Sequence, residues 1–331
     1  MAWLQFLAVS LVIVVAGVRL ARFGDVIGEK SGLGRNWIGV VLLAATTSLP
    51  ELFTGFGATA LARLPDIAVG DVLGSCMFNL LILSLMDAIQ PEPLSARAHQ
   101  GHALAIGFGL VLTAITGFGL LGGAALPVLG WVGLSTPVLA AVYVLSMRLV
   151  FRHEQHRRAR EVQEVASQLQ YAAVSTRAAV GHYATAAVLV IGAATVLPRL
   201  GATIADQTGL GQAFVGSLLI AVTTSLPEIV VSVAAVRMGA VELGIANILG
   251  SNLFNMLILG LDDVFYRDGA LLASVDAVHA VSLFGVVAMY GLFLAGLSYR
   301  ALTKRFAVAW DTAAMAAVYV AAVSLSYLMR G

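Results

Sequence analysis

Long apolar runs follow one another along the whole chain, and short stretches with glycine, proline or charged residues separate them. Each run approaches the roughly 20 residues that an α-helix needs to cross the hydrocarbon core of a bilayer. The pattern therefore predicts an all-α polytopic membrane protein with about ten transmembrane helices. The expected ranges are 2–20, 36–60, 67–89, 101–121, 125–150, 178–200, 212–236, 243–264, 271–296 and 307–329.

The composition supports the same class of protein. Hydrophobic residues make up 60% of the 331 positions and charged residues only 11%, whereas soluble domains are about 25% charged. This difference excludes an ordinary globular enzyme and makes the lipid bilayer the expected surroundings. The net charge of +1 argues against a nucleic-acid partner, which would require a basic patch. The single cysteine excludes a disulfide framework and a thiolate metal cluster.

The distribution of Lys and Arg predicts the orientation of the chain in the membrane. With the polar connection 151–177 in the cytoplasm, 15 of the 19 basic residues lie on the cytoplasmic side and 4 on the other. This bias favours a multi-pass protein of the plasma (inner) membrane with both termini outside. Arg19 and Arg22 follow the first apolar run rather than precede it, so we expect a retained first span and not a signal peptide.

Two pairs of similar segments reveal an internal repeat. Residues 39–51, GVVLLAATTSLPE, match residues 216–228, GSLLIAVTTSLPE. Residues 70–87, GDVLGSCMFNLLILSLMD, match residues 246–263, ANILGSNLFNMLILGLDD. Five predicted spans separate equivalent helices, and because five is odd, the second copy is inverted in the membrane. Inverted repeats with interrupted helices are typical of secondary transporters, whose ion site lies near the midplane.

The repeat divides the chain into three parts. Residues 1–150 are expected to form a first repeat of five helices, and residues 178–331 a second, inverted repeat of five helices. Residues 151–177 connect the two repeats in the cytoplasm. This connection is too short for a folded regulatory domain, and we expect a solvated linker rather than an interfacial helix.

Each copy of the first motif places one carboxylate inside an apolar run. Glu51 and Glu228 have no Lys or Arg near them in their predicted helices, and ionisable residues at such depth are costly and usually functional. Pro50 and Pro227 precede them, and a proline cannot donate a hydrogen bond to the carbonyl four residues earlier. Within lipid, a carbonyl freed in this way has to face protein, water or an ion. A kink beside a buried carboxylate therefore favours a cation site.

Other oxygen-bearing side chains fall at helical spacing around the two glutamates, because residues three and four apart share a helix face. Carboxylate, hydroxyl and amide oxygens suit hard cations such as Ca²⁺ or Na⁺, whereas zinc or copper would favour His or Cys. The candidate ligands are Glu51, Glu228, Thr47, Ser48, Thr224, Ser225, Ser75, Asn79, Ser251 and Asn255, and Asp71 and Asn247 are expected to line an access path.

Four other carboxylates occupy matching positions at helix ends. Asp87 and Asp263 come at the ends of the third and eighth spans, where we expect them to be solvated. Asp66 and Glu242 stand at the starts of the same spans, where a carboxylate suits the helix dipole. We interpret this second pair as structural.

With these motifs the sequence resembles the cation/Ca²⁺ exchanger superfamily, in its short prokaryotic sodium/calcium exchanger branch. That family carries G-T-S-x-P-E in its second and seventh spans, where this chain has TTSLPE at 46–51 and 223–228. It carries G-N-x-x-G-S-N/C in its third and eighth spans, where this chain has GDVLGSC at 70–76 and ANILGSN at 246–252. The resemblance covers the whole chain and implies an exchanger that transports Ca²⁺ and Na⁺ without a cofactor.

The resemblance also implies roles for individual residues. It implies a central Ca²⁺ site on Glu51 and Glu228, to which Thr47 and Thr224 contribute. It implies Na⁺ sites nearby, and the residues that would form them are Ser48, Ser75, Ser225, Ser251 and, through their carbonyls, Ala44 and Ala221.

Three departures from the family pattern bear on the transported ions. Threonine replaces the motif glycine at Thr46 and Thr223, and Asp71 stands where the family usually has asparagine. Asn255 stands where many members have aspartate, so Asn79 and Asn255 are both neutral and the inferred site holds two negative charges. The G-N-x-x-E motif of proton/Ca²⁺ exchangers is missing, which disfavours proton coupling.

These features leave more than one function open. The leading hypothesis is a Na⁺-driven Ca²⁺ antiporter that works by alternating access, in which the first and sixth spans slide across a fixed core of eight helices. The alternative is a K⁺- or H⁺-coupled cation antiporter that uses the same site. An intramembrane enzyme would need a Ser/His pair, a paired-aspartate motif or a His-rich metal site, and the sequence offers no convincing example. A monomer is sufficient for antiport, and the sequence leaves the oligomeric state open.

Overall fold

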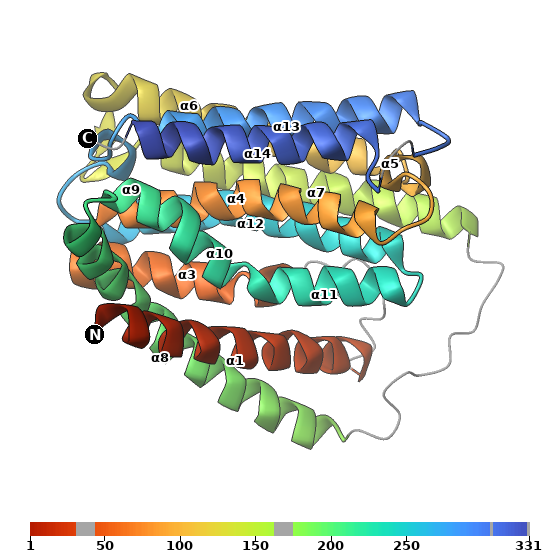
Figure 1. The fold of residues 1–331 in the computed structure, drawn as a ribbon, viewed down its shortest axis with the longest axis horizontal. Coiled ribbons are helices and arrows are strands. Elements are labelled where there is room, and N and C mark those ends of the chain that lie inside the picture. The colour runs from red at the N-terminus through yellow and green to blue at the C-terminus, as the bar shows by residue number, and fades with distance from the viewer. Residues whose placement is uncertain (31–43, 162–174, 305–306, 330–331) are drawn as a thin grey trace.

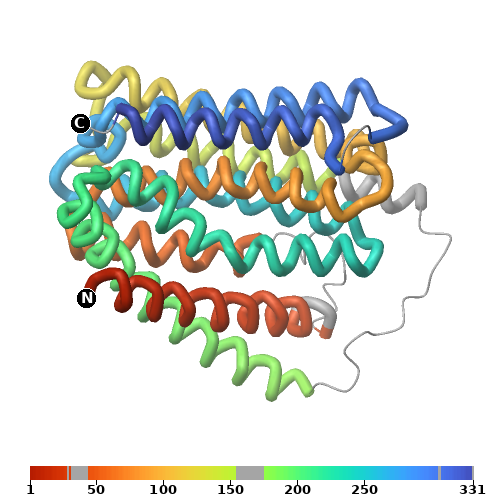
Figure 2. The backbone as a smooth tube through the Cα atoms, in the orientation of Figure 1, coloured from red at the N-terminus to blue at the C-terminus, as the bar shows by residue number. Residues whose placement is uncertain are grey.

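The computed structural model describes residues 1–30, 44–161, 175–304 and 307–329. Nearly all of them are helical, and most helices run along one common direction (Figure 1), as the backbone trace in Figure 2 also shows. Residues 44–47 form a helical turn. The remaining elements are α1 (Ala2–Lys30), α3 (Leu49–Phe56), η1 (Gly57–Ala62), α4 (Pro65–Ala88), α5 (Leu94–Arg97), α6 (His102–Gly122), η2 (Gly123–Ala125), β1 (Val128–Leu129), β2 (Val132–Gly133), α7 (Ser135–Glu161), α8 (Thr176–Thr208), α9 (Gln212–Val215), η3 (Gly216–Ile220), α10 (Ala221–Thr224), α11 (Leu226–Arg237), α12 (Val241–Phe265), η4 (Leu271–Ala273), α13 (His279–Tyr299) and α14 (Trp310–Leu328).

The predicted polytopic all-α architecture is confirmed. Among the described residues, eight helices are long and apolar enough to cross a membrane. The pair Gln212–Thr224 and Leu226–Arg237, bent by 44°, makes a ninth if it is counted as one span. The number ten is not tested, because residues 31–43, which include the start of the second predicted span, lie outside the described residues.

Two predicted spans begin later than expected. The range 125–150 becomes helical only at Ser135, because Pro127 and the left-handed Gly130 (φ 71°) favour the β1–β2 hairpin in front of it. The range 271–296 becomes a long helix only at His279. The side chain of Asp276 accepts a hydrogen bond from the backbone N–H of Val278 at 2.8 Å, and such a local bond favours a turn over a helix.

α4 and α12 form the centre of the fold and run antiparallel to each other (Figure 1). They meet where Asn252 Nδ2 donates a hydrogen bond to the carbonyl of Cys76 at 3.1 Å. Apolar side chains of α6, α7, α13 and α14 complete the main core around them. α1 and α8 lie side by side at one edge of the bundle (Figure 1) and share a smaller core with η1, η3 and the start of α4. The arrangement leaves α1 and α8 outside a compact central group of helices.

Asp87 and Asp263, which we expected to be solvated, are buried, with 0% and 3% of their surface exposed, so that expectation was wrong. Asp263 accepts a hydrogen bond from the backbone N–H of Leu271 at 2.6 Å. Asp87 accepts bonds from the backbone N–H groups of Leu94 and Ala309 at 2.7 and 2.6 Å. Each carboxylate thus satisfies a backbone donor of the loop that follows its helix, and Asp87 also satisfies one at the start of α14, which is why both leave solvent.

Among the described residues, the aspartate at the end of α4 has a positively charged partner, unlike the one at the end of α12. Lys304 Nζ lies 3.0 Å from Asp87 Oδ1, and the side chains are 6% and 0% exposed. No such pair is found for Asp263 in the part of the chain that the structure describes. The buried pair ties the end of α4 to the segment between α13 and α14.

The helix-start carboxylates make matching contacts in the two repeats. Asp66, in the first turn of α4, lies 3.0 Å from His279 Nε2 at the start of α13. Glu242, in the first turn of α12, lies 2.9 Å from His102 Nε2 at the start of α6. These contacts hold neighbouring helix starts together, in agreement with a structural role.

The two chain ends lie at one end of the bundle, and α7 ends and α8 begins at the opposite end (Figure 1). This places the flanks of the 151–177 connection away from the termini, as the prediction requires. Which end faces the cytoplasm stays a prediction.

Thiol labelling tests the orientation. A cysteine in place of Ser175, an exposed residue just before α8, should be shielded from impermeant thiol reagents in intact cells, because the Lys and Arg bias places it inside. Leu129→Cys, in the exposed hairpin, is the matched control at the opposite end and should be labelled. Both variants carry a replacement of Cys76. Labelling at position 175 and protection at position 129 would reverse the topology.

Candidate cation-binding site

Two helix breaks with the same backbone geometry lie next to the motif glutamates. Ser48 (φ −87°, ψ 11°) separates the turn 44–47 from α3, and Ser225 (φ −88°, ψ 4°) separates α10 from α11. Pro50 and Pro227 occupy the second position of the helix that follows each break. Proline is tolerated in a first helical turn, where a backbone N–H would have no partner within the helix. The repeated sequence therefore builds the same local structure twice.

The two breaks are joined by reciprocal hydrogen bonds. Ser48 Oγ donates to Glu228 Oε1 at 3.3 Å, and Ser225 Oγ donates to Glu51 Oε1 at 3.1 Å. Both glutamates and both serines are fully buried. The serine of each repeat thus binds the carboxylate of the other, and the two carboxylates come to lie at the interface between the repeats.

The central helices add hydroxyl groups in the same reciprocal way. Ser75 of α4 lies 3.3 Å from the Thr224 hydroxyl, and Ser251 of α12 lies 3.3 Å from the Thr47 hydroxyl. Such proximity requires small residues, and a Cβ at Gly74 would overlap the backbone of Ser217. Glycine lets backbones approach closely in membrane helices. The motif glycine on α4 therefore allows the hydroxyl of the next residue, Ser75, to reach the helix break.

The carbonyls of Ala44 and Ala221 belong to the same network. Ala44 O accepts from Thr47 Oγ1 at 3.1 Å. Ala221 O accepts from Thr224 Oγ1 at 3.2 Å and from Ser75 Oγ at 3.4 Å. Both alanines are buried. The two carbonyls that the resemblance assigns to Na⁺ sites thus accept hydrogen bonds from the motif hydroxyls of Thr47, Thr224 and Ser75.

The two candidate asparagines lie deeper between α4 and α12. Asn79 Nδ2 donates to Asn252 Oδ1 at 3.0 Å. Asn255 is buried, and neither atom of its amide has a hydrogen-bond partner among the described residues. Asn252 was not among the predicted site residues, although it bridges the two central helices. Its position opposite Cys76 in the aligned motifs is the signal that could have found it.

Asp71 and Asn247, which we expected to line an access path, lie in different environments. Asp71 Oδ1 accepts a hydrogen bond from Thr224 Oγ1 at 2.9 Å and so joins the central network. Asn247 Nδ2 donates to Ser232 Oγ at 3.2 Å on α11. Asp71 is therefore hydrogen-bonded to a residue of the central network, whereas Asn247 is hydrogen-bonded to a residue outside that network.

Several buried oxygens of the network have no hydrogen-bond partner among the described residues. They include one oxygen of each central carboxylate, and the set is Glu51 Oε2, Glu228 Oε2, Asp71 Oδ2 and Asn79 Oδ1. Buried oxygens without partners are destabilising unless something else satisfies them. Within the described ranges no group of three or more His, Cys, Asp or Glu side chains converges on one point. The donors are thus mostly neutral oxygens around few carboxylates, a set that suits Na⁺ or Ca²⁺.

The outer helices contact the two breaks at the threonines that replace the family glycine. Thr223 Oγ1 lies 3.3 Å from Ser10 Oγ on α1, and Thr46 Oγ1 lies 3.4 Å from the Tyr183 hydroxyl on α8. A Cβ at Gly17 of α1 would lie 2.6 Å from the Pro227 ring. Each outer helix therefore packs directly on the break of the opposite repeat.

A family model and a curated relative match most of this chain. The family model described as sodium/calcium exchanger protein matches residues 1–152 and 179–328. Inner membrane protein YrbG of Escherichia coli is 28% identical over 254 residues, which are 75% of this chain and 75% of that protein.

Two solved structures share the fold. The H⁺/Ca²⁺ exchanger CAX aligns with a TM-score of 0.70 at 12% identity, covering 99% of this chain and 86% of that one. The sodium-calcium exchanger NCX_Mj aligns with a TM-score of 0.63 at 20% identity, covering 98% of this chain and 99% of that one. At these identities the likeness concerns the fold and leaves the coupling ion open.

Proposed function

Because the chain belongs to the sodium/calcium exchanger protein family, and is therefore a membrane transporter rather than an enzyme, we propose that it exchanges Ca²⁺ for Na⁺ at the site between its two motif glutamates. The observation that carries the proposal is the reciprocal pairing of Ser48 with Glu228 and of Ser225 with Glu51. This pairing brings one buried carboxylate from each repeat to the interface between the two repeats. One chain supplies every proposed ligand, so a monomer suffices.

The negative charge of the two glutamates matches each of the two sets of ions that would be exchanged. Glu51 and Glu228 together balance one Ca²⁺ or two Na⁺, and the neutral hydroxyls, carbonyls and asparagines complete the coordination. Asp71, which is bonded to Thr224, is a third carboxylate at the edge of this network. Charge balance matters here because an uncompensated ion in a low-dielectric interior is strongly disfavoured. Empty or half-filled states of the site would be unfavourable, which favours exchange over one-way leakage.

The packing of α1 and α8 supports alternating access. These two helices lie outside the central group and touch both breaks through Ser10 and Tyr183. Sliding them across the central helices would uncover the glutamates toward one side and then toward the other, while the ligands keep their positions. The relative named as an inner membrane protein in Escherichia coli supports the same location for this chain.

Radiolabelled Ca²⁺ uptake into proteoliposomes tests the proposal. Vesicles of purified protein are loaded in turn with Na⁺, K⁺ or protons, with the ionic strength held constant by choline. Uptake is expected when Na⁺ leaves the vesicle and not when K⁺ or protons replace it. Uptake that depends on K⁺ or on a pH difference would favour the alternative antiporters.

Na⁺ is expected to raise the apparent Kd for Ca²⁺, with a steepness of at least two Na⁺ ions. The reason is that the two glutamate charges match either ion set, so both sets cannot fully occupy the same ligands together. Calorimetry of the purified protein at several Na⁺ concentrations measures the shift, and choline chloride is the control for ionic strength. Ca²⁺ affinity that ignores Na⁺ but responds to K⁺ or pH would contradict the assignment of Na⁺.

A further inference from the structure

Asp262 lies in the last turn of α12 and is fully buried, with no hydrogen-bond partner for either carboxylate oxygen among the described residues. Both oxygens face Gly55 on α3, where even a methyl group would overlap them. The charged groups near it, Asp263 and Asp71, are also carboxylates. A buried carboxylate in such surroundings is strongly disfavoured unless a cation or proton compensates it. The described protein atoms provide no such compensation.

The matching place at the opposite end of the bundle, which the inverted repeat generates, differs at three positions. The alignment of the two repeats puts a methionine there in place of Asp262, a serine in place of Gly55 and an asparagine in place of Asp71. The three pairs are Met86 and Asp262, Gly55 and Ser232, and Asp71 and Asn247. Two of these differences add a carboxylate, and the third removes a side chain and so makes room for one of them.

The matching place around Met86 is neutral and hydrogen-bonded, although Asn247 Oδ1 has no partner among the described residues. Asn247 Nδ2 donates to Ser232 Oγ at 3.2 Å, and Ser232 Oγ donates to the carbonyl of Gly244 at 3.4 Å. The terminal methyl group of Met86 packs against Gly244. The three differences therefore act together, because they exchange a neutral hydrogen-bonded pair for two buried carboxylates, of which Asp262 has no hydrogen-bond partner at either oxygen among the described residues.

This acidic position is connected to the central site. Asp71 accepts a hydrogen bond from Thr224 at the second break and interacts electrostatically with both Glu51 and Asp262. Gly55, which Asp262 faces, lies four residues after Glu51 and therefore on the same face of α3. Glu51, Asp71 and Asp262 thus form a series of carboxylates that leads from the centre toward the hairpin end of the bundle.

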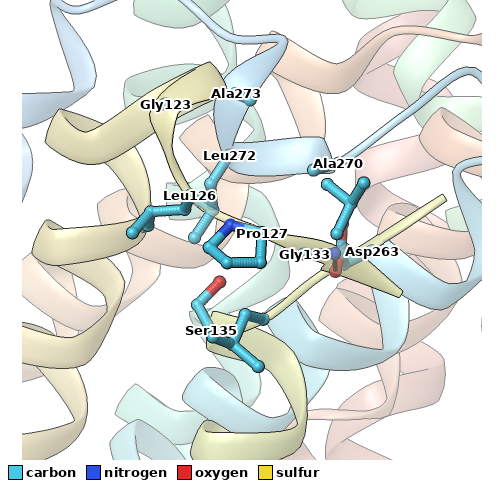
Figure 3. A pocket seen from close by; sticks show the side chains of 12 residues that line it. Gly123, Leu126, Pro127, Gly133, Ser135, Asp263, Ala270, Leu272 and Ala273 are labelled. Carbon is cyan, nitrogen blue, oxygen red and sulfur yellow. Dashed lines mark hydrogen bonds between the residues drawn. The ribbon is translucent and has the colours of Figure 1, made fainter. Parts of the chain in front are cut away.

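The residue that follows Asp262 lines a hollow at the hairpin end of the bundle. Figure 3 shows a hollow beside the β1–β2 hairpin, in which Asp263 lies near Gly133 and Ala270. Adjacent helix residues point about 100° apart, so Asp263 faces the hairpin while Asp262 faces α3. The hollow and the buried carboxylate therefore lie on different faces of the same turn of α12.

We propose that Asp262 and Asp71 form an auxiliary cation position, which holds a hard cation, Na⁺ or Ca²⁺, in passage between the central glutamates and the hairpin end of the protein. The inference rests on the proposed exchange function. It makes the two access routes unequal, because the route at the opposite end has Met86 and Asn247 in the matching places.

The test compares the wild type with Asp262→Asn in right-side-out and inside-out vesicles, by measuring Ca²⁺ uptake against Ca²⁺ concentration. When Ca²⁺ enters from the hairpin end, as identified by thiol labelling, loss of the charged ligand should raise the apparent KM about tenfold. The KM from the other side and the maximal rate should stay near wild type, since the central glutamates are unchanged. Equal shifts from both sides, or no shift, would overturn the proposal. Absence of exchange in the wild type would refute the proposed function instead.

Two further variants keep the test decisive. Gly55→Ala should give the same one-sided shift, because its methyl group displaces the Asp262 carboxylate; it decides the matter if Asp262→Asn does not fold. Asp311→Asn is the matched control, since Asp311 is also buried against a glycine, Gly296. Asp311 belongs to the first turn of α14, and that helix begins at the opposite end of the bundle (Figure 1). The control should keep both KM values. An effect of Asp262→Asn that follows pH and ignores Ca²⁺ and Na⁺ concentration would also contradict the proposal.

Discussion

Replacing either central glutamate by glutamine, as Glu51→Gln or Glu228→Gln, is expected to lower Ca²⁺ exchange about a hundredfold or more. Both carboxylates are fully buried, and leaving a buried charge without its partner costs about 3–5 kcal/mol. Each 1.4 kcal/mol is about a tenfold change in an equilibrium constant. Because the amide is nearly the same size as the carboxylate, the loss reports the charge and not the packing.

The measurement is radiolabelled Ca²⁺ uptake into proteoliposomes, with size-exclusion chromatography to confirm that each variant is folded. Glu92→Gln, the same change at an exposed position, is the matched control and should exchange like the wild type. The two single variants should be similarly impaired, since each carboxylate receives one serine hydroxyl from the opposite repeat. Wild-type exchange by either variant would remove that glutamate from the ion site.

Replacing Asp87 by alanine is expected to destabilise the folded protein by about 3–5 kcal/mol, because Lys304 would remain buried without its partner. The change also removes the acceptor for the backbone N–H groups of Leu94 and Ala309. Thermal unfolding in detergent, followed by the fraction of monodisperse protein after heating, measures the effect.

The second repeat supplies a matched comparison. Asp263→Ala removes an acceptor from Leu271 and Gly133 but leaves no buried lysine behind, so its destabilisation should be smaller than that of Asp87→Ala. The double variant Asp87→Ala with Lys304→Met should be destabilised by less than the sum of the two single variants, because both single changes break the same pair. Equal destabilisation by Asp87→Ala and Asp263→Ala would show that the ion pair contributes little.

Much of the site could be predicted because its ingredients are local and repeated. Glu51 and Glu228 are recognisable as buried carboxylates from the apolar runs around them, and the proline before each one predicts an interrupted helix. The recurrence of TTSLPE 177 positions later links the two. Helix spacing alone places the hydroxyls near each glutamate, since the rise and turn of a helix are the same in every protein.

The helix-end residues were predicted less well. Asp87 looked solvated because only one of its partners, Leu94, is close to it in the sequence. Its partners Ala309 and Lys304 lie more than two hundred positions further along the chain. Asp262 went unnoticed for a similar reason. Its aligned partner Met86 was visible in the sequence, but its orientation toward Gly55 depends on how α12 packs against α3.

Local chemistry and tertiary packing thus account for different features of this protein. Apolar length, proline position and the repeated motif already predict the membrane-spanning helices, the inverted repeat and the candidate ligands, because each depends on residues a few positions apart. The pairing of Ser48 with Glu228 and of Ser225 with Glu51 joins residues 180 and 174 positions apart. Such contacts depend on the distance and rotation between packed helices, which no local pattern encodes. For the same reason, only the folded structure shows that Asp262 faces Gly55 at one end of the bundle, and that Met86 takes the matching place at the other end.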